Sequence, residues 1–179
     1  PDPAETADRR SPSQPESGKR TVVGDTSILE DILALDAPFH RSCSGEFVLH
    51  HNVGSLCTPN DFQPLETVLK AGNSKRITAA GGRPSNSDWP YFNVAWPGAG
   101  VIVAVGWPGQ WAADFTADAA GGLRIRAGQE RTHFKLNPGE EVRTPLMVVQ
   151  FWEGDWIDAQ NVWRRWMLAH NLPRPGGQL

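Results

Sequence analysis

The sequence predicts a mainly β domain, an antiparallel β-sandwich followed by one C-terminal helix. Short apolar and β-branched runs, separated by turns that contain Pro, Gly and Asn, follow one another between residues 21 and 154. From residue 155 the apolar residues recur every three to four positions, which is the spacing of an amphipathic helix. A series of strands closed by one helix is typical of a sandwich with a connecting helix, and 179 residues suffice for one such domain.

The first 20 residues differ from the rest of the chain. Pro, Ser, Glu and Arg dominate there and apolar residues are nearly absent, so we expect a disordered linker or a frayed end. The predicted division is a linker over residues 1–20, a sandwich over 21–154, and a helix with a further linker over 155–179. Because the sequence begins with Pro and shows no signal peptide, we expect its natural N-terminus to be missing. Its compartment, the bacterial cytoplasm or the exterior, stays open.

The composition argues against two classes of partner. The net charge is -3 and no run of Lys or Arg occurs, whereas a nucleic-acid binder needs a basic face. No apolar stretch approaches the roughly 20 residues of a membrane-spanning helix. We therefore expect neither nucleic acid nor membrane as a partner.

The strands are expected, in order, at residues 28–35, 46–51, 66–69, 91–95, 101–107 and 123–127. The last of these alternates apolar and Arg side chains, as a half-buried strand does. Residues 131–136 and 142–151 are predicted to form a hairpin across Asn137-Pro138-Gly139. Within the second of these strands, the apolar run 146–151 predicts burial on both faces.

The helix is expected from Trp156 to His170, with Asp155 as its N-terminal cap. Its apolar stripe comprises Ala159, Val162, Trp163, Trp166, Met167 and His170. We therefore expect the two tryptophans of the stripe to lie in the core or in an interface. Prolines and glycines after residue 172 end the helix and open a linker.

Metal binding has little support. The sequence contains no Cys-x-x-Cys pair, and His50 and His51 are neighbours on a strand, so their side chains point to opposite faces. The two cysteines, Cys43 and Cys57, leave open a disulfide in an exported protein or two buried free thiols. We expect no metal site.

Tryptophan is the most unusual component, with eight copies against one tyrosine. Tryptophan within a strand or helix usually belongs to the core, whereas tryptophan beside Pro or Gly in a turn more often meets a ligand. Trp107 and Trp111 flank Pro108-Gly109 and are expected to join two strands. Trp89 lies beside Pro90 in a polar loop and is the stronger candidate for ligand contact.

Four segments resemble, in order and spacing, the region ahead of the catalytic barrel in glycoside hydrolase family 36-like α-galactosidases (melibiases). They are residues 81–90 (GGRPSNSDWP), 106–111 (GWPGQW), 127–134 (AGQERTHF) and 138–145 (PGEEVRTP). The family shows a Gly-Gly-Arg-Ser-Ser loop, a Gly-Trp-x-Gly-x-Trp turn, a Thr-His-Phe strand and a Pro-Gly-Glu-Glu turn before a Trp-rich helix. The similarity extends from residue 28 to about residue 170.

This resemblance implies a galactose-mutarotase-like supersandwich that precedes a catalytic (β/α)8 barrel. It also implies a galactoside-type substrate, the chain's own C-terminal barrel as partner, and no cofactor, because hydrolysis by two carboxylates needs only water. A homo-oligomer is compatible with it. Two departures stand out: Pro84 replaces the first Ser of the family loop, and the strands that open the family's sandwich have no counterpart in residues 1–20. Whether the domain lacks its first strands stays open.

No catalytic residue is expected within the chain. A retaining hydrolase needs two carboxyl groups about 5 Å apart, and the adjacent Glu140 and Glu141 would point to opposite faces of a strand. Solvation or capping accounts for the carboxylates at strand or helix ends, which are Glu130, Glu153, Asp155 and Asp158. We therefore expect the chain to be inactive by itself.

The candidate sugar-binding residues are Trp89, Asp88, Asn86 and Arg83. The indole would lie against the apolar face of a pyranose while the three polar side chains bond its hydroxyls. The alternative is that Trp89 packs within its own domain or against the barrel, and that Arg83 pairs locally.

The predicted function is that of an accessory N-terminal domain of an α-galactosidase-like glycoside hydrolase, which supports the barrel and lines the sugar site. A stand-alone carbohydrate-binding module and an inactive gene fragment are the alternatives. The Trp-bearing helix with its Pro-Gly linker favours the first, because a self-sufficient lectin needs no such connection.

Overall fold

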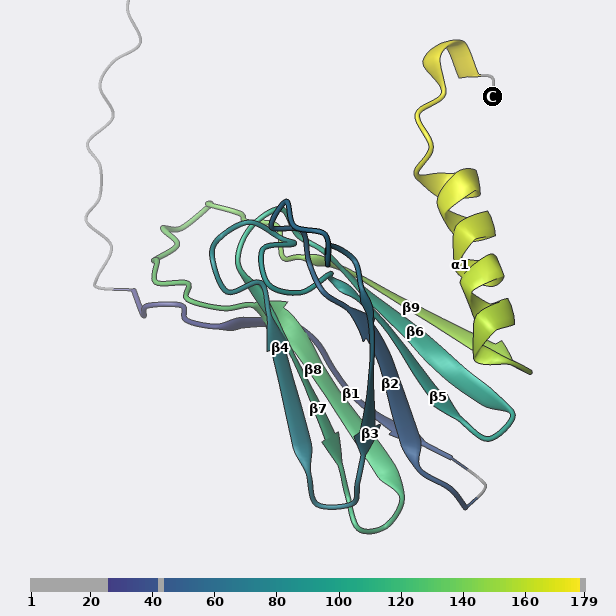
Figure 1. Cartoon of the computed structure of the whole chain (residues 1–179). Helices are drawn as coiled ribbons and strands as arrows, with labels where there is room; N and C mark the ends of the chain where they lie inside the picture. Colours follow the sequence, from purple (N-terminus) through teal and green to yellow (C-terminus); the bar gives the residue numbers. More distant parts are fainter. Residues whose placement is uncertain (1–25, 42–43, 178–179) are drawn as a thin grey trace, which may run out of the picture.

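Residues 26–41 and 44–177 are described by a computed structural model, in which two antiparallel sheets face each other and one helix follows (Figure 1). One sheet has the order β1 (Ile32–His40), β8 (Gly122–Gln129), β7 (Trp111–Ala117) and β4 (Ser74–Thr78). The other has the order β3 (Pro64–Leu69), β2 (Phe47–Asn52), β5 (Tyr91–Trp96), β6 (Ala99–Gly106) and β9 (Leu146–Glu153). The expected mainly β antiparallel sandwich with a C-terminal helix is confirmed.

The core between the sheets follows from alternation along the strands. On β8, Leu123, Ile125 and Ala127 are buried, while Arg124 and Arg126 point to solvent. This confirms the half-buried strand that the sequence predicts here. The facing side chains come from the inner face of the five-stranded sheet and include Phe47, Leu49, Phe92, Val94, Val101, Val103 and Val105.

Helix α1 (Trp156–His170) lies on the outer face of the five-stranded sheet, away from the four-stranded one (Figure 1). As expected, Asp155 caps it, and its carboxylate accepts a hydrogen bond from the Ile157 amide at 2.7 Å. The residues that pack together here are Tyr91, Ile102, Ala104, Trp152, Trp156, Ala159 and Trp163. A short 3-10 turn, η1 (Pro175–Gly177), follows the helix.

The predicted apolar stripe of α1 is only partly covered by the sheet. Ala159 is buried and Trp163 packs against the outer face of the sheet. Met167 and His170, which continue the stripe toward the end of the helix, are exposed. The sheet therefore holds mainly the first half of α1.

A buried polar chain joins the helix to the sheet. The Trp152 indole N–H donates to the Asn93 side chain at 2.9 Å, and Asn93 donates to the Trp156 carbonyl at 3.2 Å. The Trp152 ring approaches β6 closely because position 100 is glycine, since a Cβ there would come within 2.1 Å of the ring. The start of α1 is thus fixed by buried hydrogen bonds as well as by apolar packing.

The predicted hairpin across residues 137–139 is wrong. A turn does form there, with Gly139 at a φ of 85°, but it joins two irregular segments. Arg131 has a φ of 58°, which interrupts an extended strand, and Phe134 pairs with Leu29 instead. Strand β9 pairs with β6.

The prediction that residues 146–151 are buried on both faces is also wrong. Strand β9 is the last in its sheet, so one edge has no strand beside it in the described part of the chain. Leu146 and Phe151 are accordingly 63% and 66% exposed. Strands β4 and β7 are not among the expected strands, and β1 begins at Ile32 rather than at residue 28.

The expectation of a disordered linker concerns residues 1–20, which lie outside the described residues, as does Cys43. Cys57 is an exposed free thiol, so the expectation of a buried thiol is wrong for this residue. Within the described ranges, no helix has the length and apolar character needed to cross a membrane.

Candidate functional site

The loop that carries the candidate residues crosses from β4 in one sheet to β5 in the other. Its backbone is bonded to the segment after β2, where the Gly54 amide donates to the Ser87 carbonyl at 2.9 Å. The indole N–H of the buried Trp111 donates to the Pro84 carbonyl at 2.7 Å. The loop is therefore attached both to its neighbour and to the core.

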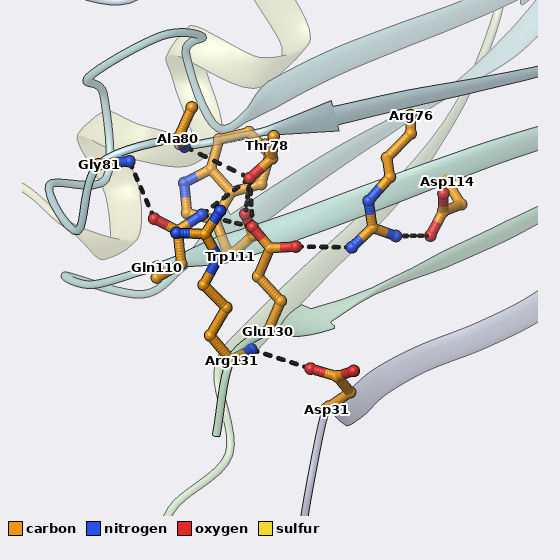
Figure 2. Close-up of polar contacts among 10 residues, drawn as sticks. All are labelled: Asp31, Arg76, Thr78, Ala80, Gly81, Gln110, Trp111, Asp114, Glu130 and Arg131. Atoms are coloured by element: carbon orange, nitrogen blue, oxygen red, sulfur yellow. Dashed lines mark hydrogen bonds and ion pairs between the residues drawn. The ribbon is translucent and has the colours of Figure 1, made fainter. Parts of the chain in front are cut away.

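A polar network around Glu130 fixes the start of this loop (Figure 2). The Glu130 carboxylate accepts hydrogen bonds from the Thr78 hydroxyl, the Gln110 side-chain amide and the Arg76 guanidinium. The Gln110 carbonyl oxygen in turn accepts from the backbone amides of residues 81 and 82, at 3.0 and 2.8 Å. We call the side chains of Arg76, Thr78, Gln110 and Glu130 the Glu130 network.

Glu130 is held as an ionised acceptor. Burial alone would raise its pKa, but the hydrogen bonds from Thr78, Gln110 and Arg76 together lower that pKa. Arg76 also bonds Asp114 at 2.6 Å and thus bridges two carboxylates. A carboxylate engaged in this way anchors structure, which is a more specific role than the solvation or capping expected at a strand end.

Trp89 borders a hollow of about 330 Å³ between the five-stranded sheet and α1, which we call the Trp89 hollow. Its lining comprises Asn52, Phe62, Trp89, Tyr91, Gln160 and Trp163. The Trp89 ring meets Phe62 at nearly a right angle with a centroid distance of 5.1 Å, and Trp89 is 39% exposed. Aromatic walls combined with a few amide groups are a usual composition for a small-ligand site.

Hydrogen bonds fix two walls of this hollow. The Tyr91 hydroxyl donates to the Gln160 side chain, and burial raises the pKa of Tyr91, so the phenol stays protonated as a donor. On another wall, Asp61 organises the turn that presents Phe62. Its carboxylate accepts from the backbone amides of residues 56–58.

Three of the four candidate residues do not line the Trp89 hollow. Arg83 donates to Asn86 at 2.8 Å, which is a local pairing. Asp88 accepts from the Ser87 hydroxyl at 2.8 Å and lies 3.7 Å from the buried His51 ring. Burial acts to raise the pKa of Asp88, but its interactions with His51 and Ser87 lower it overall. These three polar side chains are thus engaged within the domain rather than grouped around the open ring.

The remaining tryptophans divide between core and helix surface. Trp111 is fully buried on β7, Trp107 is partly buried against the same core, and their turn connects β6 to β7. Trp163 and Trp166 are half-buried on α1, and their rings stack with a centroid distance of 5.0 Å. Trp89 differs from these four tryptophans because it lies in a loop and its ring borders an open hollow.

The two adjacent histidines have separate surroundings, as expected. His50 stacks on Trp156 with a centroid distance of 3.9 Å, on the side of α1. His51 lies in the interior, where its ring bonds the Thr67 hydroxyl at 3.2 Å. No cluster of three or more side chains able to hold a metal ion occurs among the described residues.

Phe62, Tyr91 and Gln160 belong to the hollow although no sequence argument assigned them to it. Phe62 follows a Pro-Asn-Asp turn, where a large apolar residue is unusual. This unusual position is the sequence feature that could have indicated Phe62 as a site residue. Gln160 lies next to the apolar stripe of α1, but a polar residue on a helix flank is common and indicates no site. Asn52, Phe62 and Trp89 contact one another directly, and Gln160 and Trp163 join them only when α1 docks on the sheet.

These features define a class of protein by fold: a two-sheet antiparallel β-sandwich that carries a helix on one outer face. No protein-family model matches the chain, and no curated protein matches it. Solved structures do match, and they include α-galactosidases, some of them of glycoside hydrolase family 36.

Three of these structures show how similar the chain is to them in sequence identity, TM-score and coverage. The α-galactosidase AgaA from Geobacillus stearothermophilus is 18% identical, with a TM-score of 0.57, over 68% of this chain and 17% of that one. The galactosidase domain of the α-galactosidase-sucrose kinase AgaSK is 17% identical, with a TM-score of 0.61, over 71% and 18%. The α-galactosidase from Lactobacillus brevis is 16% identical, with a TM-score of 0.61, over 71% and 17%. Variants of AgaA have been solved with raffinose and with stachyose.

The comparison confirms the resemblance to family 36 α-galactosidases at the level of the fold. At 16–18% identity it shows shared architecture alone. The chain spans less than one fifth of the length of each of these structures. The substrates of those enzymes are therefore not transferred to this chain by the comparison, and they enter only as part of a proposal.

Proposed function

We propose that this chain is an accessory domain of an α-galactosidase-like glycoside hydrolase. In this proposal residues 21–154 form the sandwich, and residues 155–179 connect it to a catalytic barrel elsewhere in the polypeptide. The observation that carries the proposal is the Trp89 hollow, an open aromatic site on a sandwich whose fold matches part of family 36 α-galactosidases.

The hollow has the chemistry that carbohydrate recognition needs. A pyranose ring has a face of C–H groups, which packs against an aromatic ring, and a rim of hydroxyls, which hydrogen-bonds to polar side chains. Trp89 and Phe62 provide the first kind of contact, while Asn52 and Gln160 provide the second. Because the similar structures are α-galactosidases, we assign the hollow to a galactoside-type sugar.

The exposed apolar side chains of α1 support the second part of the proposal. Ile157 and Leu168 are 59% and 49% exposed. They lie about three helical turns apart and therefore share one face, which points away from the buried Ala159. Asn161 and Arg164 lie between them on this face, so Ile157 and Leu168 are two separate apolar contact points rather than a continuous apolar patch. In this proposal the barrel covers them.

The test is a kinetic comparison in the complete natural polypeptide. Replacing Trp89 by Ala removes the proposed ring contact, so KM for raffinose should rise about tenfold, the equivalent of about 1.4 kcal/mol, while the fold stays intact. Phe151→Ala is the control and should leave KM unchanged, because this aromatic is also exposed but lies on the edge strand outside the hollow. An unchanged KM in Trp89→Ala would overturn the assignment of the hollow.

A stand-alone carbohydrate-binding module is the second candidate, and the same hollow favours it. The two candidates differ in what the complete polypeptide does. An accessory domain belongs to a product that hydrolyses an aryl α-galactoside, whereas a binding module belongs to one that binds the sugar without hydrolysing it.

A further inference from the structure

A second hollow of about 360 Å³ adjoins the Trp89 hollow along helix α1. Its walls include His50, Glu66 and Trp156, and it shares Asn52 and Gln160 with the first hollow. Because two lining residues are common to both, the two hollows are neighbours between α1 and the outer face of the five-stranded sheet, and we call the pair the groove. We call this second part the His50 hollow.

The two shared side chains each keep one polar group without a hydrogen-bond partner among the described residues. Asn52 donates its side-chain N–H to the Phe62 carbonyl at 3.0 Å, which leaves its side-chain oxygen as an acceptor. Gln160 uses its side-chain oxygen to accept from Tyr91, which leaves its side-chain N–H groups as donors. An acceptor and a donor thus lie at the junction of the two hollows.

The His50 hollow pairs an aromatic wall with a carboxylate. The rings of His50 and Trp156 stack with an interplanar angle of 9° and a centroid distance of 3.9 Å, which gives a fixed aromatic wall. The Glu66 carboxylate lies 3.4 Å from His50 and its side chain is 61% exposed, so the carboxylate can accept further hydrogen bonds. This combination repeats the composition of the first hollow and adds a charge.

We propose that the groove binds an oligosaccharide, with one ring in the Trp89 hollow and the next ring in the His50 hollow. Glu66 is then the residue that distinguishes longer from shorter chains, because it accepts hydroxyl hydrogen bonds from the second ring. This inference rests on the proposed function and specifies its substrate class.

A protein segment is a less suitable occupant of the groove. A packed protein interface would desolvate the Glu66 carboxylate and the polar groups of Asn52 and Gln160, and each would then need a partner of matching geometry. Hydroxyls on successive carbons of a sugar ring supply donors and acceptors at short, regular spacing. The combination of polar groups with aromatic walls therefore favours a sugar chain.

The experiment measures KM in the complete natural polypeptide for an aryl α-galactoside, raffinose and stachyose. Glu66→Ala should raise KM about tenfold for both raffinose and stachyose, because each carries a second ring, and this corresponds to the loss of one hydrogen bond to a charged group. KM for the aryl galactoside, which has no second sugar ring, should stay unchanged. Glu66→Gln keeps the shape and one acceptor, so a smaller rise is expected. Glu141→Ala, which removes an exposed carboxylate outside the groove, is the matched control.

The outcomes separate this inference from the proposed function. If Trp89→Ala raises KM for raffinose while Glu66→Ala changes no KM, the second ring does not lie in the His50 hollow and the inference is overturned alone. If neither variant changes any KM, both fail. Loss of thermal stability by the natural polypeptide in the same two variants would then identify the groove as a domain interface.

Discussion

Glu130 illustrates how much a single side chain can organise. Arg76 and Thr78 on β4, together with Gln110 in the turn before β7, converge on its carboxylate just after the end of β8. Gln110 also holds the backbone that leads into the candidate loop. From the sequence alone Glu130 could be placed at a strand end, but its partners could not, because they depend on how three strands pair.

The first prediction concerns this network. Glu130→Ala should lower the free energy of unfolding by about 1–3 kcal/mol, because Thr78 and Gln110 lose an acceptor in a half-buried setting. The ion pair with the half-exposed Arg76 adds little to this figure. Urea unfolding measures the change, and Glu141→Ala, at an exposed position, should stay within about 0.5 kcal/mol of the native chain. Equal effects of the two substitutions would contradict the anchoring role.

The second prediction concerns pH. Burial lowers the pKa of His50 below its ordinary value of 6.5, and the neighbouring charges of Glu66, His51 and Asp155 only modify this effect. The folded state therefore favours the neutral ring more than the unfolded state does. This contribution to stability is complete above about pH 6.5 and is lost as the pH falls from there through the pKa of the folded state.

Thermal unfolding between about pH 5 and 7.5 tests this sign. The Tm of the native chain should rise with pH over this range, and the Tm of His50→Gln should rise less. The carboxylates whose pKa is lowered, such as Glu130 and Asp88, lose their contribution only at lower pH and do not disturb the comparison. Parallel pH profiles for the two proteins would show that burial of His50 does not matter for stability.

Among the elements, the strands with strong alternation were predictable and the others were not. The apolar and Arg residues of β8 alternate so regularly that only a half-buried strand fits them. Strand β7 has three alanines in seven residues, which carry little strand preference, yet it lies in the middle of its sheet. The turn at residues 137–139 does form, but a local turn does not determine which strands pair. Strand β9 pairs with β6, which is distant in sequence, and the turn residues give no indication of this.

The third prediction concerns the attachment of α1. A methyl group at position 100 would lie 2.1 Å from the Trp152 ring and 2.4 Å from the Val94 carbonyl, so Gly100→Ala must displace both groups or shift β6 itself. Overpacking of this kind costs about 1–3 kcal/mol. The Tm should fall, and the near-ultraviolet circular dichroism of the tryptophans should change because Trp152 contacts Asn93 and the helix. An unchanged near-ultraviolet spectrum would mean that the ring does not lie against β6.

For the whole molecule, the sandwich and its helix could be predicted, whereas the groove could not. The groove is lined by residues of β2, the turn after it, β3, the loop before β5, β5 itself and α1. They range from position 50 to position 163 of the sequence. Of the four candidate residues only Trp89 lines this space, and the sequence indicates it because tryptophan in a Pro-flanked polar loop is difficult to bury. Arg83, Asn86 and Asp88 are neighbours of Trp89 in sequence, but Arg83 and Asn86 bond each other, and Asp88 is held by Ser87 and the His51 ring.

The central claim is that this sandwich works as part of a larger glycoside hydrolase. The most direct test is the intact mass of the natural gene product, combined with its activity toward an aryl α-galactoside. We predict a product much larger than the 19.6 kDa of this chain that hydrolyses the substrate. A product of about this mass, or a larger one without hydrolytic activity, would contradict the claim.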